Sequence, residues 1–124
     1  MDATKATRVE TRSSKTNRDN DFVHKMDNVI KEICRVAADF TSPFFTPSND
    51  AMSRRIHYID TKCLYLSRAK FDVSPKYNYC LSKIQYAKDI ISMEAAKPKY
   101  NMLYLSDELY RIAYDMYNHT NDLR

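Results

Sequence analysis

The sequence predicts an all-α fold, a small bundle of about four amphipathic helices behind an N-terminal tail that is disordered or ordered by a partner. Apolar residues recur every three or four positions through most of the chain, which is the period of a helix with one buried face. Proline marks the breaks between these stretches, at Pro43, Pro47, Pro75 and Pro98. The chain has no glycine, so the tight Asn-Gly hairpins of antiparallel sheets are absent.

Residues 1–20 differ from the rest of the chain because they contain almost no large apolar residue. Five basic and three acidic residues give this segment a net charge of +2. Such a segment stays solvated by itself, although its basic residues would align on one face if a partner induced a helix. We therefore divide the chain into a polar basic tail, residues 1–20, and a single α-helical domain, residues 21–124, long enough to bury a core.

The first helix is expected to begin at an N-cap provided by Asn20 or Asp21. Its apolar stripe consists of Phe22, Met26, Val29, Ile30, Ile33, Ala37 and Phe40. Pro43 ends the helix, since the residue before a proline avoids helical dihedral angles. The adjacent Phe44 and Phe45 then either plug the end of the helical core, which we expect, or form an exposed docking knob.

The second helix is predicted from about Ser48 to about Lys70, with Thr46 or Ser48 as its cap. One arc of this helix suits a core and carries Met52, Ile56, Ile59, Cys63 and Leu66. The opposite arc, which we call the basic face, carries Arg54, Arg55, Tyr58, Lys62, Tyr65 and Arg68. A merely solvated face needs no tyrosine rings among its cations, so we predict that the basic face binds a partner.

Ser74 and Pro75 are typical of the N-cap and first residue of a third helix. Its stripe runs through Tyr77, Cys80, Leu81, Ile84, Ala87, Lys88, Ile91 and Met93 toward Ala96. After Pro98, a fourth helix is expected to open at Asn101, with a second cap at Ser106. It carries Leu105, Leu109, Ile112, Ala113 and Met116. Helices joined by such short turns pack most simply as an up-and-down bundle.

Tyrosine is unusually frequent, with ten residues in a chain that has no tryptophan. Tyr110, Tyr114 and Tyr117 form a stripe beside the apolar face of the fourth helix. A tyrosine ring can be buried while its hydroxyl stays in water, so this stripe suits either the rim of a small core or a protein interface. We add these three tyrosines to the candidate partner-binding residues.

Catalytic and cofactor sites find little support in the sequence. Without glycine there is no phosphate loop, dinucleotide fingerprint or nucleophile elbow. Cys34, Cys63 and Cys80 are far apart, which fits buried hydrophobic residues better than zinc ligands or disulfides. His57 and Asp60 share a helix face without a nucleophile beside them, so we interpret them as surface residues rather than a catalytic dyad. We predict no catalytic residue, no metal site and no cofactor, and no small-molecule substrate is evident.

Charge is distributed unevenly along the chain. Residues 53–71 carry +4 and residues 75–99 carry +3, whereas residues 21–52 and 100–124 each carry −2. The total of +4 is too small to require nucleic acid, yet a local basic face can bind phosphates. The same polarity suits a subunit that packs against acidic neighbours in an oligomer.

The leading hypothesis is a non-enzymatic structural or adaptor subunit of a larger protein assembly, which binds acidic proteins or oligomer neighbours through its tyrosine-rich and basic helix faces. The alternative is a nucleic-acid-binding helical module that uses the face of residues 53–70. No apolar run approaches a membrane span and no secretory signal is present, so we expect an intracellular protein of the cytoplasm or nucleus, without membrane contact. The composition also fits an AT-rich genome, as many large DNA viruses have, and hence a viral structural component.

Overall fold

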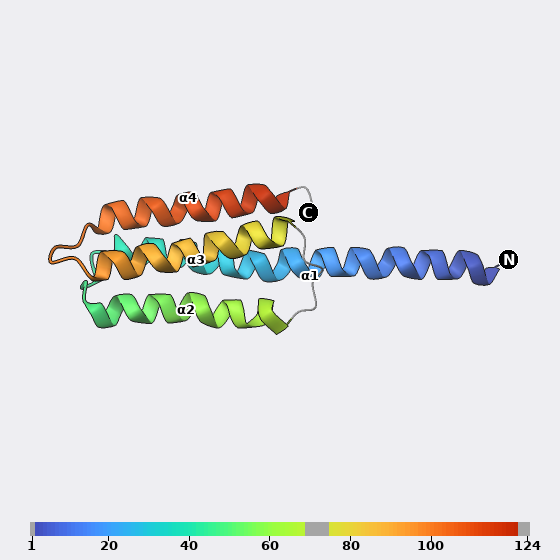
Figure 1. Cartoon of the computed structure of the whole chain (residues 1–124), viewed down its shortest axis with the longest axis horizontal. Helices are drawn as coiled ribbons and strands as arrows, with labels where there is room; N and C mark the ends of the chain where they lie inside the picture. The colour runs from blue at the N-terminus through green and yellow to red at the C-terminus, as the bar shows by residue number, and fades with distance from the viewer. Residues whose placement is uncertain (1, 69–74, 122–124) are drawn as a thin grey trace.

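The computed structural model describes the backbone of residues 2–68 and 75–121 and the side chains of residues 21–64, 66 and 75–121. Four helices make up most of these ranges: α1 (Asp2–Phe40), α2 (Asn49–Arg68), α3 (Pro75–Ala95) and α4 (Met102–Thr120). They alternate in direction as an up-and-down bundle (Figure 1). Both α1 and α3 pack against α2 and α4. The predicted all-α bundle is therefore confirmed.

The first helix is much longer than the others, with 39 residues against 19 to 21. Its N-terminal half projects beyond the bundle, so the backbone of residues 2–20 lies outside the packed helices (Figure 1). The prediction that the helix begins at Asn20 or Asp21 is wrong, because α1 already begins at Asp2. Among the described side chains, which begin at Asp21, the first member of the hydrophobic core is Phe22.

Local signals in the sequence end and start the helices as expected. The last turn of α1 tightens before Pro43, where the Thr41 N–H donates to the Ala38 carbonyl at 3.3 Å. Ser48 caps α2, because its Oγ accepts from the Ala51 N–H at 3.0 Å. Asn101 caps α4 in the same way, its Oδ1 accepting from the Tyr104 N–H at 3.1 Å. Within the described ranges the backbone has no positive φ angle, which suits a chain without glycine.

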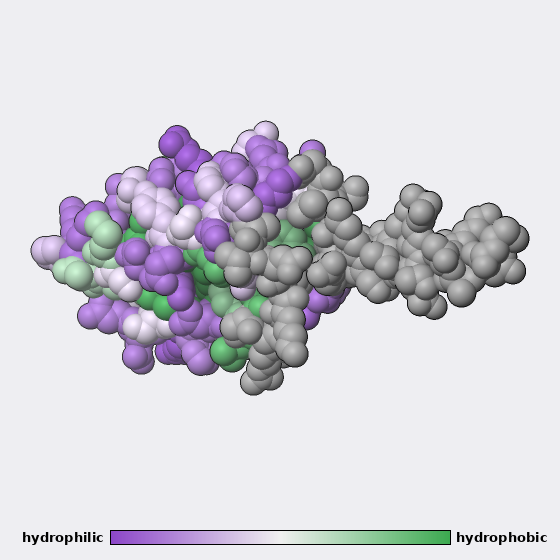
Figure 2. Space-filling model, turned by 45° about the vertical axis from the view of Figure 1, so that its right-hand side comes forward, coloured by the Kyte–Doolittle hydropathy of each residue, from purple (hydrophilic) through white to green (hydrophobic). Residues whose placement is uncertain are grey.

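The inward stripes of all four helices meet in one hydrophobic core. Each helix contributes an isoleucine that is at most 3% exposed, and these are Ile33, Ile59, Ile84 and Ile112. The predicted core positions of α1 are also buried. Figure 2 shows mainly hydrophilic residues on the face that it presents, with hydrophobic ones in the recesses between them. Among the described residues, no helix is long and apolar enough to cross a membrane.

Predictions at three individual positions are wrong. Ser106 does not recap α4, because it lies inside the continuous helix, buried, with its Oγ donating to the Ala37 carbonyl of α1 at 2.8 Å. Leu81 and Met93 do not belong to the inward stripe of α3, because both are exposed, whereas Ile90 and Glu94 are buried. A turn after α3 supplies partners for the Glu94 carboxylate, and a periodic pattern of apolar residues cannot reveal that.

Candidate binding surfaces

Of the six residues of the basic face, four have described side chains, and these are Arg54, Arg55, Tyr58 and Lys62. The side chains of Tyr65 and Arg68 lie outside the described residues. Arg54 and Tyr58 are exposed and Lys62 is half-buried, so these three lie on the outer side of α2 as the helical period predicts. The nearest carboxylate to Arg54 is that of Asp50, 3.9 Å away and one turn earlier.

Arg55 lies differently from its neighbour, since its side chain is only 19% exposed and reaches from α2 toward α1. Its Nε lies 3.5 Å from Asp39 Oδ2, and its Nη1 donates to the Ala51 carbonyl at 3.4 Å. The guanidinium carbon lies 4.9 Å from the centroid of the Phe45 ring and 5.7 Å from that of Tyr58. Aromatic rings and a carboxylate therefore hold this arginine in one orientation.

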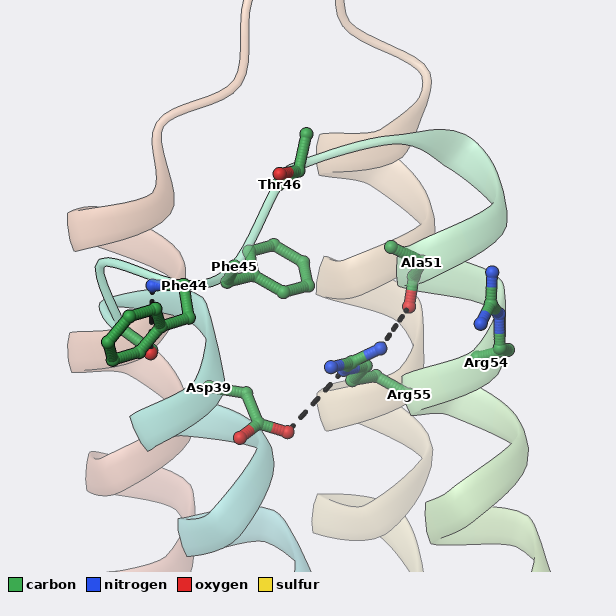
Figure 3. A pocket seen from close by; sticks show the side chains of 8 residues that line it. Asp39, Phe44, Phe45, Thr46, Ala51, Arg54 and Arg55 are labelled. Carbon is green, nitrogen blue, oxygen red and sulfur yellow. Dashed lines mark hydrogen bonds and ion pairs between the residues drawn. The ribbon is translucent and has the colours of Figure 1, made fainter.

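An open hollow of about 350 Å³ lies where α1 turns into α2 (Figure 3). We call it the arginine pocket, and its walls are Asp39, Ser42, Phe44, Phe45, Thr46, Ala51, Arg54 and Arg55. The view in Figure 3 shows Phe45 and Arg55 in the middle of the hollow, with Phe44 on one side and Arg54 on the other. The pocket thus combines two cations, one carboxylate and two aromatic rings.

The two adjacent phenylalanines have opposite environments. Phe45 packs edge-on against Phe40 at the end of α1, with ring centroids 5.3 Å apart, and so plugs the core as predicted. Phe44 is 94% exposed, so the prediction that it also plugs the core is wrong, and its exposure is what the docking-knob alternative requires. The Phe44 N–H donates to Ser42 Oγ at 3.2 Å, a contact that fixes the turn while the ring faces water.

A second hollow, of about 430 Å³, runs between α1 and α4. We call it the tyrosine groove, and it is lined by Ile30, Cys34, Tyr110, Ala113, Tyr114 and Tyr117. The structure thus brings together all three tyrosines predicted on α4, and each of them is exposed. Tyr114, at 69%, is the most exposed of the three. Burial raises the pKa of the Cys34 thiol, so at neutral pH this residue acts as an apolar part of the wall.

A polar cluster that the sequence analysis missed joins α3 to α4. The Tyr79 hydroxyl donates to Asp115 Oδ2 at 2.5 Å, and Lys83 Nζ lies 3.1 Å from the same oxygen. The His119 ring stacks on Tyr79 at a centroid distance of 3.5 Å. The hydrogen bonds from Tyr79 and Lys83 hold the pKa of Asp115 below its usual 3.8, while the bond to Asp115 raises the pKa of Tyr79. No sequence signal links Tyr79 to Asp115, because 36 positions separate them.

The residues considered for catalysis in the sequence lie in separate surroundings. His57 is exposed, and its helix neighbour Asp60 accepts a hydrogen bond from Lys88 of α3 at 2.7 Å. Burial raises the pKa of both Cys63 and Cys80 to about 11, which keeps these thiols protonated at neutral pH. Within the described part of the chain, no group of three or more His, Cys, Asp and Glu side chains is arranged to hold a metal ion.

Comparisons with protein-family models, with curated proteins and with solved structures find no match to this chain. A function must therefore be argued from the two hollows and the residues around them.

Proposed function

We propose that this protein is a non-enzymatic structural or adaptor subunit of a larger assembly, and that the tyrosine groove is its principal contact. The observation that carries the proposal is the exposure of three tyrosine rings around an apolar groove, on a bundle whose four inward stripes already pack against one another. The rings are thus not needed to complete the core. Rings in that position are available to a partner.

Tyrosine at such a site favours protein binding on energetic grounds. Its ring buries a large area at a small cost in conformational entropy, and its hydroxyl can find a hydrogen-bond partner at the wet edge of an interface. Tyrosine is accordingly among the residues that dominate binding energy when they lie near the centre of an interface. The helix-helix groove beneath Tyr110 and Tyr114 offers a concave apolar floor for a partner side chain.

The basic face supports a protein partner better than nucleic acid. Its two described arginines both lie close to acidic groups, Arg54 near Asp50 and Arg55 near Asp39. Those carboxylates would repel a phosphate backbone, which requires several uncompensated cations along its length. The alternative of a nucleic-acid-binding module is therefore an outcome for the experiment to test.

The experiment compares the wild type with Tyr110→Ser/Tyr114→Ser, and with Tyr86→Ser as a control for an exposed tyrosine on α3. Each tagged chain is used to capture proteins from its native source at 0.15 and at about 1 M salt, and its mass is measured by light scattering. We expect the wild type and the control to retain the same partner or oligomer at both salt concentrations, because ring burial is not screened. We expect the double variant to lose it.

Two results would contradict the proposal. One is a wild type that is monomeric and captures nothing, and the other is a double variant that keeps every partner of the wild type. Capture that disappears at high salt or after nuclease treatment would instead support the nucleic-acid module.

A further inference from the structure

We infer that the arginine pocket binds an acidic peptide segment of the partner, in which a Glu or Asp carboxylate meets Arg54 and Arg55 while a neighbouring apolar residue packs on Phe44. This inference rests on the proposed contact function and specifies the partner chemistry of a second surface. It is carried by the arrangement of donors, charge and exposed ring around one hollow of about 350 Å³.

Arg55 is held in one orientation, but most of its donors make no hydrogen bond to a described residue. A guanidinium has five N–H donors, and in the described part of the chain Arg55 makes one hydrogen bond, from Nη1 to the Ala51 carbonyl at 3.4 Å. Its buried Nε makes no hydrogen bond to any described residue, because Asp39 stays 3.5 Å away. Contacts with the Phe45 and Tyr58 rings keep the group in place. Arg55 lines the pocket, so its remaining Nη donors are held ready for an acceptor that enters it.

Arg54 is available to the same acceptor. Its side chain is 64% exposed, and Asp50, its nearest carboxylate, is 92% exposed and 3.9 Å away. An exposed pair at this distance contributes little to stability, so Arg54 can exchange Asp50 for a ligand at low cost. Together, Arg54 and Arg55 can grip one carboxylate from two sides, with the strong geometry of charge-assisted hydrogen bonds.

The net charge of the pocket wall favours a peptide carboxylate over a nucleic acid. The pocket wall contains two arginines and Asp39, and Asp50 lies just outside it. A wall with one net positive charge complements a single carboxylate. A nucleic acid would bring a row of phosphates past Asp39 and Asp50, and would find few cations to replace its counterions.

Phe44 gives the pocket an apolar contact. The ring is 94% exposed, and Figure 3 shows it on the opposite side of Phe45 and Arg55 from Arg54. A short peptide that crosses the hollow can therefore reach the ring with an apolar side chain and the arginines with a carboxylate. Exposing a phenylalanine this fully is unfavourable in water, and covering it adds binding energy that does not depend on salt.

The test uses the isolated full chain and three probes: a blocked hexapeptide of Ser with one Leu-Glu pair, which carries a single carboxylate, the same peptide with Gln for Glu, and a single-stranded dodecamer of thymidine. Binding is followed by NMR, through the Nε–Hε signals of the arginines and the ring signals of Phe44. We expect the Glu peptide to shift the signals of Arg54, Arg55 and Phe44, and the Gln peptide to bind at least about tenfold more weakly, because charge-assisted hydrogen bonds are lost.

Two exposed substitutions and their matched controls assign the effect to the pocket. Arg54→Gln should weaken binding of the Glu peptide by about tenfold or more, whereas Arg111→Gln, at an exposed arginine that also has a nearby carboxylate, should leave it unchanged. Phe44→Ala should weaken both peptides by about fivefold, whereas Leu103→Ala, another exposed apolar residue, should not. None of these changes touches the buried core, so the fold is retained.

Several outcomes overturn the inference: no shift at the pocket with the Glu peptide, equal binding of the Gln peptide, equal effects of Arg54→Gln and Arg111→Gln, or tighter binding of the oligonucleotide. The proposed function is judged separately, because it is tested through Tyr110 and Tyr114 with captured partners. Capture that depends on those tyrosines, together with a silent arginine pocket, refutes this inference alone.

Discussion

The two described turns at the same end of the bundle close it in different ways (Figure 1). The turn between α3 and α4 is built around Glu94, which is 1% exposed and has both carboxylate oxygens engaged. Its Oε1 lies 3.1 Å from Lys97 Nζ, and its Oε2 accepts from the Asn101 N–H at 2.8 Å. This turn leaves its buried charge satisfied and so has the properties of a structural cap.

The turn between α1 and α2 remains open by comparison. It places one phenylalanine in the core and the next in water, and it leaves Arg55 beside a hollow with unused donors. The two turns even touch, because the Tyr100 hydroxyl donates to Asn49 Oδ1 at 3.0 Å. Where two neighbouring turns have the same structural task, the one that keeps exposed and unsatisfied groups is the better candidate for binding.

The largest loss of stability should come from substitutions in the hydrophobic core and not from substitutions in either turn. Replacing Ile59 of α2 or Ile112 of α4 with alanine should each cost ~2–5 kcal/mol of unfolding free energy, because both side chains are at most 3% exposed. Urea denaturation measures the loss, with Met93→Ala as an exposed control expected within ~0.5 kcal/mol. Losses no greater than that of the control at both sites would show that these stripes do not form the core.

The next largest loss of stability should come from substitution of Glu94, because its buried carboxylate holds together the turn between α3 and α4. Glu94→Ala removes the buried carboxylate and leaves its two partners, Lys97 and the Asn101 N–H, without their acceptor. The substitution should cost ~1–3 kcal/mol of unfolding free energy. Glu108→Ala is the matched control, because it breaks a surface ion pair with Arg111, at 3.5 Å, without touching a backbone N–H. Chemical denaturation of the two variants gives the comparison. Equal losses would mean that the closed turn is no more structural than an exposed helix face.

Alanine substitutions at the two phenylalanines of the turn between α1 and α2 should have unequal effects on stability. Phe45→Ala should cost ~1–2 kcal/mol, less than a fully buried phenylalanine, because its ring is half-buried against Phe40 and Arg55. Phe44→Ala should change stability by less than ~0.5 kcal/mol, because the ring is exposed. Thermal unfolding of both variants measures the difference. A large loss for Phe44→Ala would assign that ring to packing and weaken its role in binding.

The sequence predicted the helices and their buried faces because apolar periodicity and proline positions are local signals. It could not predict how Glu94 is buried, since a charged residue is buried only where distant backbone and side-chain groups satisfy it. Arg55 is a similar case. The helical period places it on the basic face, but the fold of the preceding turn brings Asp39 and Phe45 against it. The tyrosines of α4 were predictable as a stripe, whereas the groove beneath them depends on Ile30 and Cys34 of α1.

The opposite end of the bundle should show a smaller effect that depends on pH. The pKa of Asp115 in the folded chain is lowered from 3.8, chiefly by the hydrogen bond from Tyr79 and also by Lys83. A depressed pKa means that the ionised carboxylate stabilises the fold above its unfolded pKa, and that this contribution is lost as the pH falls through the folded value. The difference in urea midpoint between wild type and Asp115→Asn should therefore be present at pH 6 and should shrink below pH 3.8.

Asp107→Asn provides the control for this pH dependence, because Asp107 is an exposed carboxylate of the same helix. It should match the wild type across the whole pH range. A difference for Asp115→Asn that stays constant from pH 6 to pH 2 would show that the cluster of Tyr79, Lys83, Asp115 and His119 contributes through packing and not through the charge of its carboxylate.

Deletion of residues 1–20 should have only a small effect on stability, although it removes a sixth of the chain. Deleting residues 1–20 takes away the part of α1 that projects beyond the bundle but leaves every described residue of the core, from Phe22 onward, in place. A helical segment without neighbours adds little to stability in water, so the thermal midpoint should change by less than ~4 °C, the shift that 1 kcal/mol produces in a domain of about this size. Deleting residues 1–26 also removes the buried Phe22 and Met26 and should lower the midpoint several times more.

Equal midpoints for the two truncations would place the start of packing after Met26. A large fall in the midpoint already for the shorter truncation would show that residues 1–20 stabilise the domain. A loss of partner capture at an unchanged midpoint would instead make the tail a third contact, beside the tyrosine groove and the arginine pocket.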